Sequence, residues 1–325
     1  MAGAQRARGD VLKTWLVRAG QLVLTVAVTW FIVARVGLNL SALGDLGVEA
    51  WLPEPVLFTA ATALLLGAYF VSAGLWGLIV RELGGPAIPA AEAVRLFMIA
   101  NLGRYLPGKV WQIAGLAALA KGRGVPAITA TGAAVLGQGI ALVAASAVGM
   151  GAFLAGPEQY RRWGVVGAVL VGVLVVLVSI PPIFNRLAAL WFRLARTEAR
   201  VPLRSMHGLK WLGLYVLNWV MYAGAFWVLS RSLGSAGGLV PVGSAFAAAY
   251  VLGYAMVFAP AGLGPREGFL ILFLTPHLGA TASGVTAVVA RLWTTLVELV
   301  PAGFFWMRHL ARSGSVPGPA PGEGP

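Results

Sequence analysis

The sequence predicts an all-α integral membrane protein with about six transmembrane helices and two re-entrant broken hairpins. Apolar residues make up 59% of the chain and charged residues 11%, whereas soluble domains carry roughly 25% charged residues. The mean hydropathy is +0.83. Apolar windows of about 20 residues recur along the chain, and each is long enough to cross a hydrocarbon core of roughly 30 Å. This composition argues against a soluble globular protein.

Several functional classes are disfavoured by the same composition. The chain has no cysteine, which excludes disulfides, thiolate metal sites and cysteine nucleophiles. Its three histidines, His207, His277 and His309, are scattered and have no metal-ligand spacing, so we expect no metal and no cofactor. The formal charge of +13 does not indicate nucleic-acid binding, because the basic residues lie between apolar stretches, where they set membrane topology.

Six apolar stretches predict full membrane spans. They cover residues 16–36, 55–80, 127–154, 164–184, 208–230 and 284–307. The first is long and has no small-residue cleavage site behind its basic N-terminal segment, so we interpret it as a retained span. Two further apolar segments, 91–120 and 241–276, are interrupted in the middle by proline and glycine, which break helices.

Loop charge favours a hairpin over a crossing for each interrupted segment. With the N-terminus inside, a hairpin at 91–120 keeps most basic loops on the cytoplasmic side, as the positive-inside rule requires. Those residues are Arg6, Arg8, Lys13, Arg18, Arg81, Arg95, Lys121, Arg123, Arg186, Arg193, Arg196, Arg200, Arg204, Lys210, Arg308 and Arg312. The predicted location is therefore the cytoplasmic membrane, with both termini cytoplasmic.

The two halves of the chain repeat one pattern of span, span, hairpin and span. Each half has three crossings, and an odd number inverts the second copy, as in the inverted repeats of secondary transporters. We predict one membrane domain over residues 1–312, with pseudo-repeats 1–155 and 160–310. Residues 313–325 are rich in proline and glycine and predict a disordered tail.

The first interruption carries a candidate headgroup site. Arg104 and Lys109 lie within an apolar segment, where an arginine or lysine at the bilayer centre costs roughly 2.5–3.5 kcal/mol. Together they suit a phosphate group, the arginine as a forked donor and the lysine as a point charge. The alternative is a shallow hairpin whose cations reach the interface. The neighbouring candidates are Asn101, Tyr105, Trp111 and Gln112, and Pro107 and Gly108 form the turn.

The segment from Gly103 to Lys109 also approaches the P-loop pattern. Val110 stands where that motif needs serine or threonine to ligate magnesium, and no buried strand precedes it. We therefore reject nucleotide binding at this segment.

The second interruption carries Arg266 and Glu267 behind a turn formed by Pro260, Gly262 and Gly264. The freed N–H groups at the start of the following helix, together with the arginine, suit an anion. Glu267 has two alternative roles: pairing with Arg104, Lys109 or Arg291 across the hairpins, or pairing locally with Arg266 to cap its helix. Arg291 and Glu298 are seven residues apart and share one helix face, which we expect to face the bundle interior. Gln138 and Asn218 are expected to be packing contacts.

The segments Arg104–Trp111 and Pro260–Glu267 resemble the lysylphosphatidylglycerol synthase transmembrane-region family of proposed lipid flippases. In bifunctional members of that family, a soluble transferase follows the membrane domain. The present sequence ends after the membrane region, so the resemblance implies a stand-alone member that does not synthesise the lipid. It implies a lipid translocase rather than an enzyme, with a phosphate-bearing lipid as cargo.

Several points stay open at the level of sequence. The cargo is either an aminoacylated phospholipid or a polyprenyl-phosphate-linked sugar, and a lipid-modifying synthase or glycosyltransferase is a candidate partner. Two other functional classes are a membrane enzyme acting on lipid phosphates, with Glu267 as the base, and a non-transporting scaffold for a synthase. The direction of transfer, the coupling ion, the oligomeric state and the depth of the second hairpin do not follow from the sequence.

Overall fold

The computed structural model describes residues 44–105, 110–180, 182–183, 186, 207–256, 259 and 262–313, together with positions 23, 26 and 30. Every element in this part of the chain is helical, which confirms the predicted all-α class. The elements are η1 (Val48–Trp51), α3 (Pro55–Glu82), α4 (Ala90–Asn101), η2 (Leu102–Tyr105), α5 (Trp111–Lys121), α6 (Ala127–Leu154), α7 (Glu158–Ser179), α9 (His207–Ser232), α10 (Leu239–Ala255), α11 (Pro265–Leu278) and α12 (Ala280–Ser313).

Four of the described helical stretches are long and apolar enough to cross a membrane: Val48–Glu82, Ala127–Leu154, His207–Ser232 and Ala280–Arg308. They coincide with the spans predicted at 55–80, 127–154, 208–230 and 284–307. The span predicted at 164–184 corresponds to α7, whose apolar part covers Gly164–Leu177. The span predicted at 16–36 lies outside the described residues apart from three positions, so the total of six stays a prediction.

Local sequence accounts for the ends of α3. Pro55 occupies the first turn, where its missing N–H costs nothing, and the Glu54 carboxylate accepts hydrogen bonds from the N–H groups of Val56 at 2.9 Å and Leu57 at 2.7 Å. The helix ends just before Gly84, whose φ of 83° is a conformation that favours glycine. The 28 residues between these signals are mostly apolar and form one uninterrupted helix.

Small residues let the long helices approach closely. A Cβ atom added to Gly149 on α6 would lie 2.8 Å from the backbone nitrogen of Ala248 on α10. One added to Gly243 on α10 would lie 2.9 Å from the carbonyl oxygen of Ala223 on α9. Both are closer than real Cβ contacts, so an alanine at either position would push two helices apart. Glycine at these positions is typical of packing between membrane helices.

The outer surface of the bundle is apolar. On α7, the side chains of Val165, Val169, Leu170 and Val173 are all more than half exposed. On α12, Leu292 and Leu296 are also exposed, at 61% and 59%. Large exposed apolar surfaces are costly in water and ordinary in lipid. This surface supports a multi-pass membrane protein.

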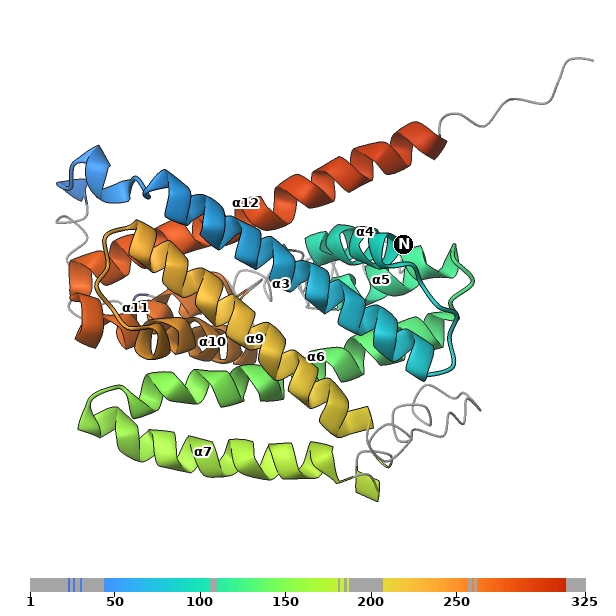
Figure 1. The fold of residues 1–325 in the computed structure, drawn as a ribbon, viewed down its shortest axis with the longest axis horizontal. Helices are drawn as coiled ribbons and strands as arrows, with labels where there is room; N and C mark the ends of the chain where they lie inside the picture. The colour runs from blue at the N-terminus through green and yellow to red at the C-terminus, as the bar shows by residue number, and fades with distance from the viewer. Residues whose placement is uncertain are drawn as a thin grey trace, which may run out of the picture.

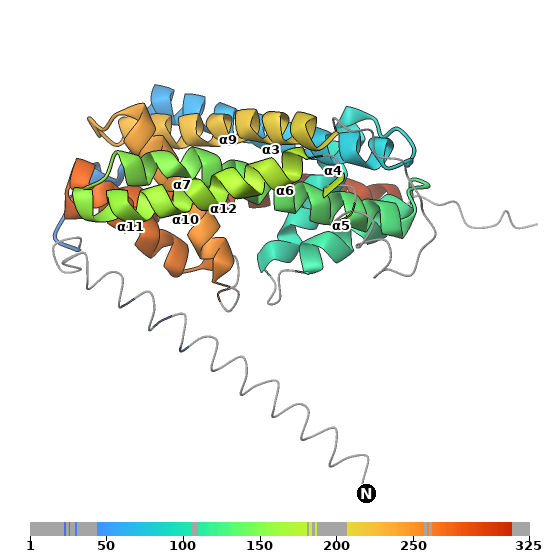
Figure 2. The same ribbon diagram turned by 90° about the horizontal axis from the view of Figure 1, so that it is seen from below.

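The two interrupted segments form helix pairs at opposite ends of the molecule. In Figures 1 and 2, α4 and α5 lie at the end where α3 finishes, whereas α10 and α11 lie at the end where α3 begins. Within each pair, the two helices pack on one another. Consequently α5 ends on the same side of the bundle as α4 begins, and α11 ends on the side where α10 begins.

Basic side chains concentrate at the end that carries α4 and α5. There Glu92 pairs with Arg95 at 2.6 Å and with Arg123 at 2.9 Å, and Lys210 pairs with Glu82 at 2.6 Å. Arg81 and Lys121 lie in the last turns of α3 and α5 at this same end. The topology predicted from the sequence places these basic residues on one side of the membrane.

Candidate functional site

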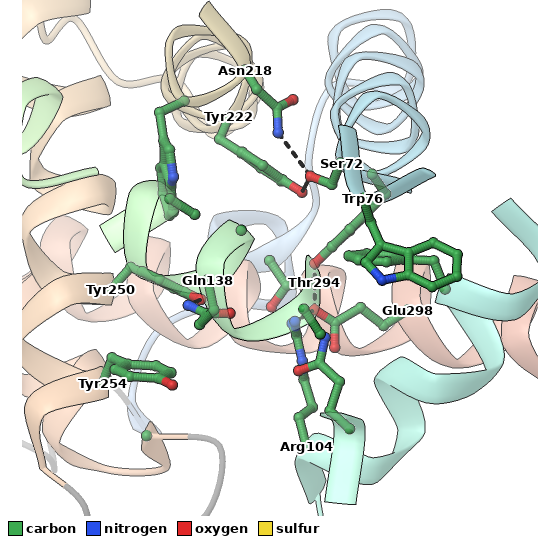
Figure 3. Close-up of a pocket in the computed structure, with 18 of the residues that line it drawn as sticks. Ser72, Trp76, Arg104, Gln138, Asn218, Tyr222, Tyr250, Tyr254, Thr294 and Glu298 are labelled. Carbon is green, nitrogen blue, oxygen red and sulfur yellow. Dashed lines mark hydrogen bonds and ion pairs between the residues drawn. The ribbon is translucent and has the colours of Figure 1, made fainter. Parts of the chain in front are cut away.

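A cavity of about 160 Å³ lies within the bundle, between the long helices and both broken pairs (Figure 3). Its lining combines charged and polar side chains with aromatic ones. The charged lining residues are Arg104 from η2, Arg266 from α11, and Arg291 and Glu298 from α12. Segments far apart in the sequence therefore meet at one site.

Glu298 is the centre of a buried hydrogen-bonded cluster. Glu298 is 4% exposed, and its carboxylate forms an ion pair with Arg104, with 2.6 Å between Nη1 and Oε1. The hydroxyl of Tyr105 donates to Oε2 at 2.7 Å, and the hydroxyl of Tyr69 donates to Oε1. Three donors thus hold both carboxylate oxygens, as a buried charge requires. On sequence alone Glu267 was a candidate partner for Arg104, and the partner in the structure is Glu298.

Arg266 lies in the first turn of α11 and faces aromatic rings. Its Cζ atom is 4.8 Å from the ring centroid of Phe246 and 5.7 Å from that of Tyr250, within the range of cation–π contacts. In the described part of the chain, no carboxylate pairs with this guanidinium. Gly253 makes the approach feasible, because a Cβ there would lie 2.8 Å from the Cβ of Arg266. Arg266 is therefore the arginine of the cavity whose charge is not neutralised by a described neighbour.

Glu267 turns away from Arg266 toward the last span. Its Oε1 lies 3.6 Å from Nη1 of Arg291, and its Oε2 accepts a hydrogen bond from the N–H of Gly264 at 2.7 Å. The sequence offered several partners for Glu267, and the structure pairs it with Arg291. Its local pair with Arg266 is not formed among the described atoms. Glu267 nevertheless caps α11, as that alternative supposed. The preceding turn needs glycine, because φ is 70° at Gly262 and 87° at Gly264.

A network of neutral polar groups completes the wall. Asn218 donates from Nδ2 to Oγ of Ser72 at 2.7 Å, and this hydroxyl lies 3.0 Å from the hydroxyl of Tyr222. Gln138 lies 3.4 Å from the hydroxyl of Tyr250. Asn218 joins α9 to α3 and so makes the helix contact expected of it, yet it also lines the cavity, as does Gln138. The Oδ1 atom of Asn218 has no hydrogen-bond partner among the described residues.

Sequence reasoning identified Tyr105 but missed the other tyrosines of the cavity. The chain has seven, and six of them line the cavity: Tyr69, Tyr105, Tyr215, Tyr222, Tyr250 and Tyr254. A signal was present in the spacing. Tyr215, Asn218 and Tyr222 recur at intervals of three and four, so they share one face of α9. Tyr69, Tyr215 and Tyr222 also lie inside the apolar spans predicted at 55–80 and 208–230 rather than in an interfacial belt.

The structure brings together seven of the residues that the sequence predicted for the headgroup site and its turns. Those that line the cavity are Arg104, Tyr105, Gln112, Gly262, Arg266, Arg291 and Glu298. The lining does not include four other predicted residues: Asn101, Trp111, Gly264 and Glu267. Asn101 is buried and accepts a hydrogen bond at Oδ1 from Nε2 of Gln112 at 2.6 Å, so it positions a lining residue. Lys109, Pro107, Gly108 and Pro260 lie outside the described residues.

The ionisable groups of the cavity suit an anion better than a metal. Three arginines and one glutamate line it, which leaves an excess of positive charge. Over the described ranges, no group of three or more His, Asp or Glu side chains is placed to hold a metal ion. Guanidinium groups bind phosphate through paired hydrogen bonds.

Residues 18–302 match the family model described as Lysylphosphatidylglycerol synthase TM region. No curated protein and no solved structure matches the chain.

Proposed function

The chain belongs to the lysylphosphatidylglycerol synthase TM region family, and on that premise we propose that it is a lipid translocase for a phosphate-bearing lipid. The cargo class at this level includes aminoacylated phospholipids and polyprenyl-phosphate-linked sugars. Within this proposal the chain is a transporter rather than an enzyme, and a lipid-modifying synthase or glycosyltransferase supplies the lipid.

The observation that carries the proposal is that Arg104 and Arg266 line one cavity. They come from the two broken helix pairs, which lie at opposite ends of the molecule. A phosphate between them would receive forked hydrogen bonds from both sides. The tails of the lipid would stay outside, against the apolar surface of the bundle.

The Arg104–Glu298 pair gives the site a neutral resting arrangement. Before a ligand binds, Glu298 neutralises Arg104. A phosphate can bind Arg104 through guanidinium N–H groups other than the one on Nη1 that donates to Glu298. Arg104 and Glu298 then stay paired during binding, which avoids the cost of an unpaired buried charge.

We further propose that both broken pairs are re-entrant hairpins and that the two halves of the chain form an inverted repeat in the cytoplasmic membrane. The elements α3, α4–α5 and α6 have counterparts in α9, α10–α11 and α12. The clustering of basic residues at the α4–α5 end supports a cytoplasmic location for that end and for both termini.

Single-cysteine labelling tests this topology directly, because the chain has no native cysteine. Ala87→Cys and Lys121→Cys flank the α4–α5 pair, and Ala236→Cys and Thr281→Cys flank the α10–α11 pair; all four positions are exposed. We expect an impermeant thiol reagent to reach the first two only from the cytoplasmic side and the last two only from the opposite side. Labelling of Ala87→Cys and Lys121→Cys from different sides would contradict the hairpin.

Transfer by the purified protein is expected to continue without nucleotide. The segment near Arg104 has Val110 where a P-loop places its magnesium ligand, so the chain offers no site for ATP there. The measurement is transfer of a fluorescent lipid in nucleotide-free proteoliposomes, with and without added ATP. An absolute requirement for ATP would refute this expectation.

The same proteoliposomes separate the translocase from its alternatives. A fluorescent phosphatidylglycerol in one leaflet is followed by its accessibility to a membrane-impermeant quencher, and the lipid is then extracted and analysed. Leaflet exchange of unchanged lipid supports the translocase, whereas chemical conversion supports the membrane enzyme. If the lipid is neither exchanged between leaflets nor converted, the scaffold becomes the better interpretation.

A further inference from the structure

We propose that the headgroup carried by this protein is an uncharged, hydroxyl-bearing group joined through phosphate, and that aminoacylated phospholipids are poor substrates. This inference rests on the proposed translocase function and narrows its cargo. The juxtaposition behind it is a cavity in which both oxygens of the lining carboxylate already accept hydrogen bonds, while the opposite wall offers neutral hydrogen-bonding groups (Figure 3).

The charges of the cavity disfavour an ammonium group. A cationic headgroup removed from water needs a carboxylate partner, and Glu298 is the carboxylate on the described lining. Arg104, Tyr69 and Tyr105 already engage its two oxygens. Glu267, the nearest alternative, is held by Arg291 and by the N–H of Gly264. An aminoacyl headgroup would therefore add positive charge beside three arginines.

The wall away from Glu298 suits hydroxyl groups. Gln138 presents an amide, and the buried Asn218 holds the hydroxyl of Ser72, which lies 3.0 Å from that of Tyr222. Tyr222, Tyr250 and Tyr254 add phenolic hydroxyls that both donate and accept. A polyol or sugar needs this mixture of donors and acceptors, because each of its hydroxyls does both.

Aromatic rings supply the apolar part of the same wall. Tyr250 and Tyr254 stack with 6.1 Å between their ring centroids, and Trp219 lies 4.7 Å from Tyr250. Rings with a polar edge bury apolar area and keep a hydrogen-bonding tip in the cavity. The arginine cluster and the aromatic wall thus match the two parts of the proposed headgroup, the phosphate and the uncharged hydroxylated group.

The direct test compares two fluorescent lipids with identical acyl chains in proteoliposomes: phosphatidylglycerol and lysylphosphatidylglycerol. The first has a phosphate and a glycerol with free hydroxyls, and the second adds a cationic lysyl ester. We expect transfer of phosphatidylglycerol to be faster by about tenfold or more, the discrimination that roughly 1.4 kcal/mol provides. A third probe, phosphatidylmethanol, keeps the phosphate without free hydroxyls, and its transfer rate should be lower than that of phosphatidylglycerol.

A designed substitution adds a gain-of-function test. Gln138→Glu places a carboxylate on the neutral wall at nearly unchanged shape, and it should shift the ratio of the two rates toward lysylphosphatidylglycerol by about tenfold. Gln138→Met is the matched control, which removes the polar group without adding charge and should not raise transfer of the lysyl lipid. Melting in detergent checks that each variant is folded.

The outcomes distinguish this inference from the function beneath it. If the parent protein moves lysylphosphatidylglycerol as fast as phosphatidylglycerol or faster, the headgroup inference is wrong and the translocase stands. If the parent protein moves none of the three probes, the proposed function itself is overturned. The comparison of the two lipids on the parent protein tests the headgroup inference even if Gln138→Glu does not fold.

Discussion

Replacing Arg266 by glutamine is expected to reduce lipid transfer by at least about tenfold while leaving the fold intact. Arg266 lines the cavity and is not ion-paired to any described carboxylate, so its removal leaves no buried opposite charge behind. The substitution loses the cation–π contacts to Phe246 and Tyr250 but also removes a cation without a described carboxylate partner from the bundle interior, and these two effects on stability oppose one another. The measurements are transfer in matched proteoliposomes and thermal melting in detergent.

Two further substitutions give this experiment its controls. Arg266→Lys keeps the charge but not the forked geometry and should recover only part of the activity. Arg231→Gln removes an exposed arginine at the far end of α9, away from the cavity lining, and should transfer lipid at the parent rate. Parent-level transfer by Arg266→Gln would show that this residue does not bind the phosphate.

Local signals in the sequence predict most of the fold. Proline and glycine fix where helices start and stop, which is why the stretch predicted at 127–154 coincides with α6 and the two interruptions fall between α4 and α5 and between α10 and α11. These signals act over a few residues and are therefore legible in one sequence. The arrangement of helices about the cavity depends instead on packing between distant segments.

The candidate site was accessible from sequence to the extent that its residues are unusual for a membrane interior. A charged side chain within an apolar segment is costly and is therefore conspicuous in the sequence, as it is for Arg104, Arg266, Arg291 and Glu298. Tyrosine carries no such cost, because its ring is apolar and its hydroxyl needs a single partner, so Tyr69 and Tyr222 did not stand out. They line the cavity because α3 packs against α9.

Partners across the bundle could not be assigned either. Arg104 and Glu298 are 194 residues apart, and the sequence gives no register between η2 and α12. Glu267 was an equally reasonable partner for Arg104 on charge alone. The three-dimensional structure decides between them, since Glu267 is drawn to Arg291 while Glu298 pairs with Arg104.

This pairing makes Arg104 behave differently from Arg266 on substitution. Arg104→Gln is expected to abolish transfer and also to destabilise the protein, because it leaves the Glu298 carboxylate buried with two tyrosine donors and no cation. Breaking a buried ion pair from one side costs roughly 3 kcal/mol. The melting temperature in detergent should therefore fall by several degrees, unlike that of Arg266→Gln.

A compensating substitution separates the structural role of Arg104 from its role in binding. In the double variant Arg104→Gln/Glu298→Gln, no charge is left without a partner. One tyrosine hydroxyl can donate to the amide oxygen introduced at position 298 and the other can accept from the amide N–H, so we expect melting near the parent temperature. Lipid transfer should nevertheless stay at the level of Arg104→Gln, because the forked donor for the phosphate is still absent. Recovery of transfer together with stability would mean that Arg104 serves only to neutralise Glu298. Recovery of stability alone would establish that the pair can be dispensed with for folding and that the guanidinium of Arg104 is required for transport.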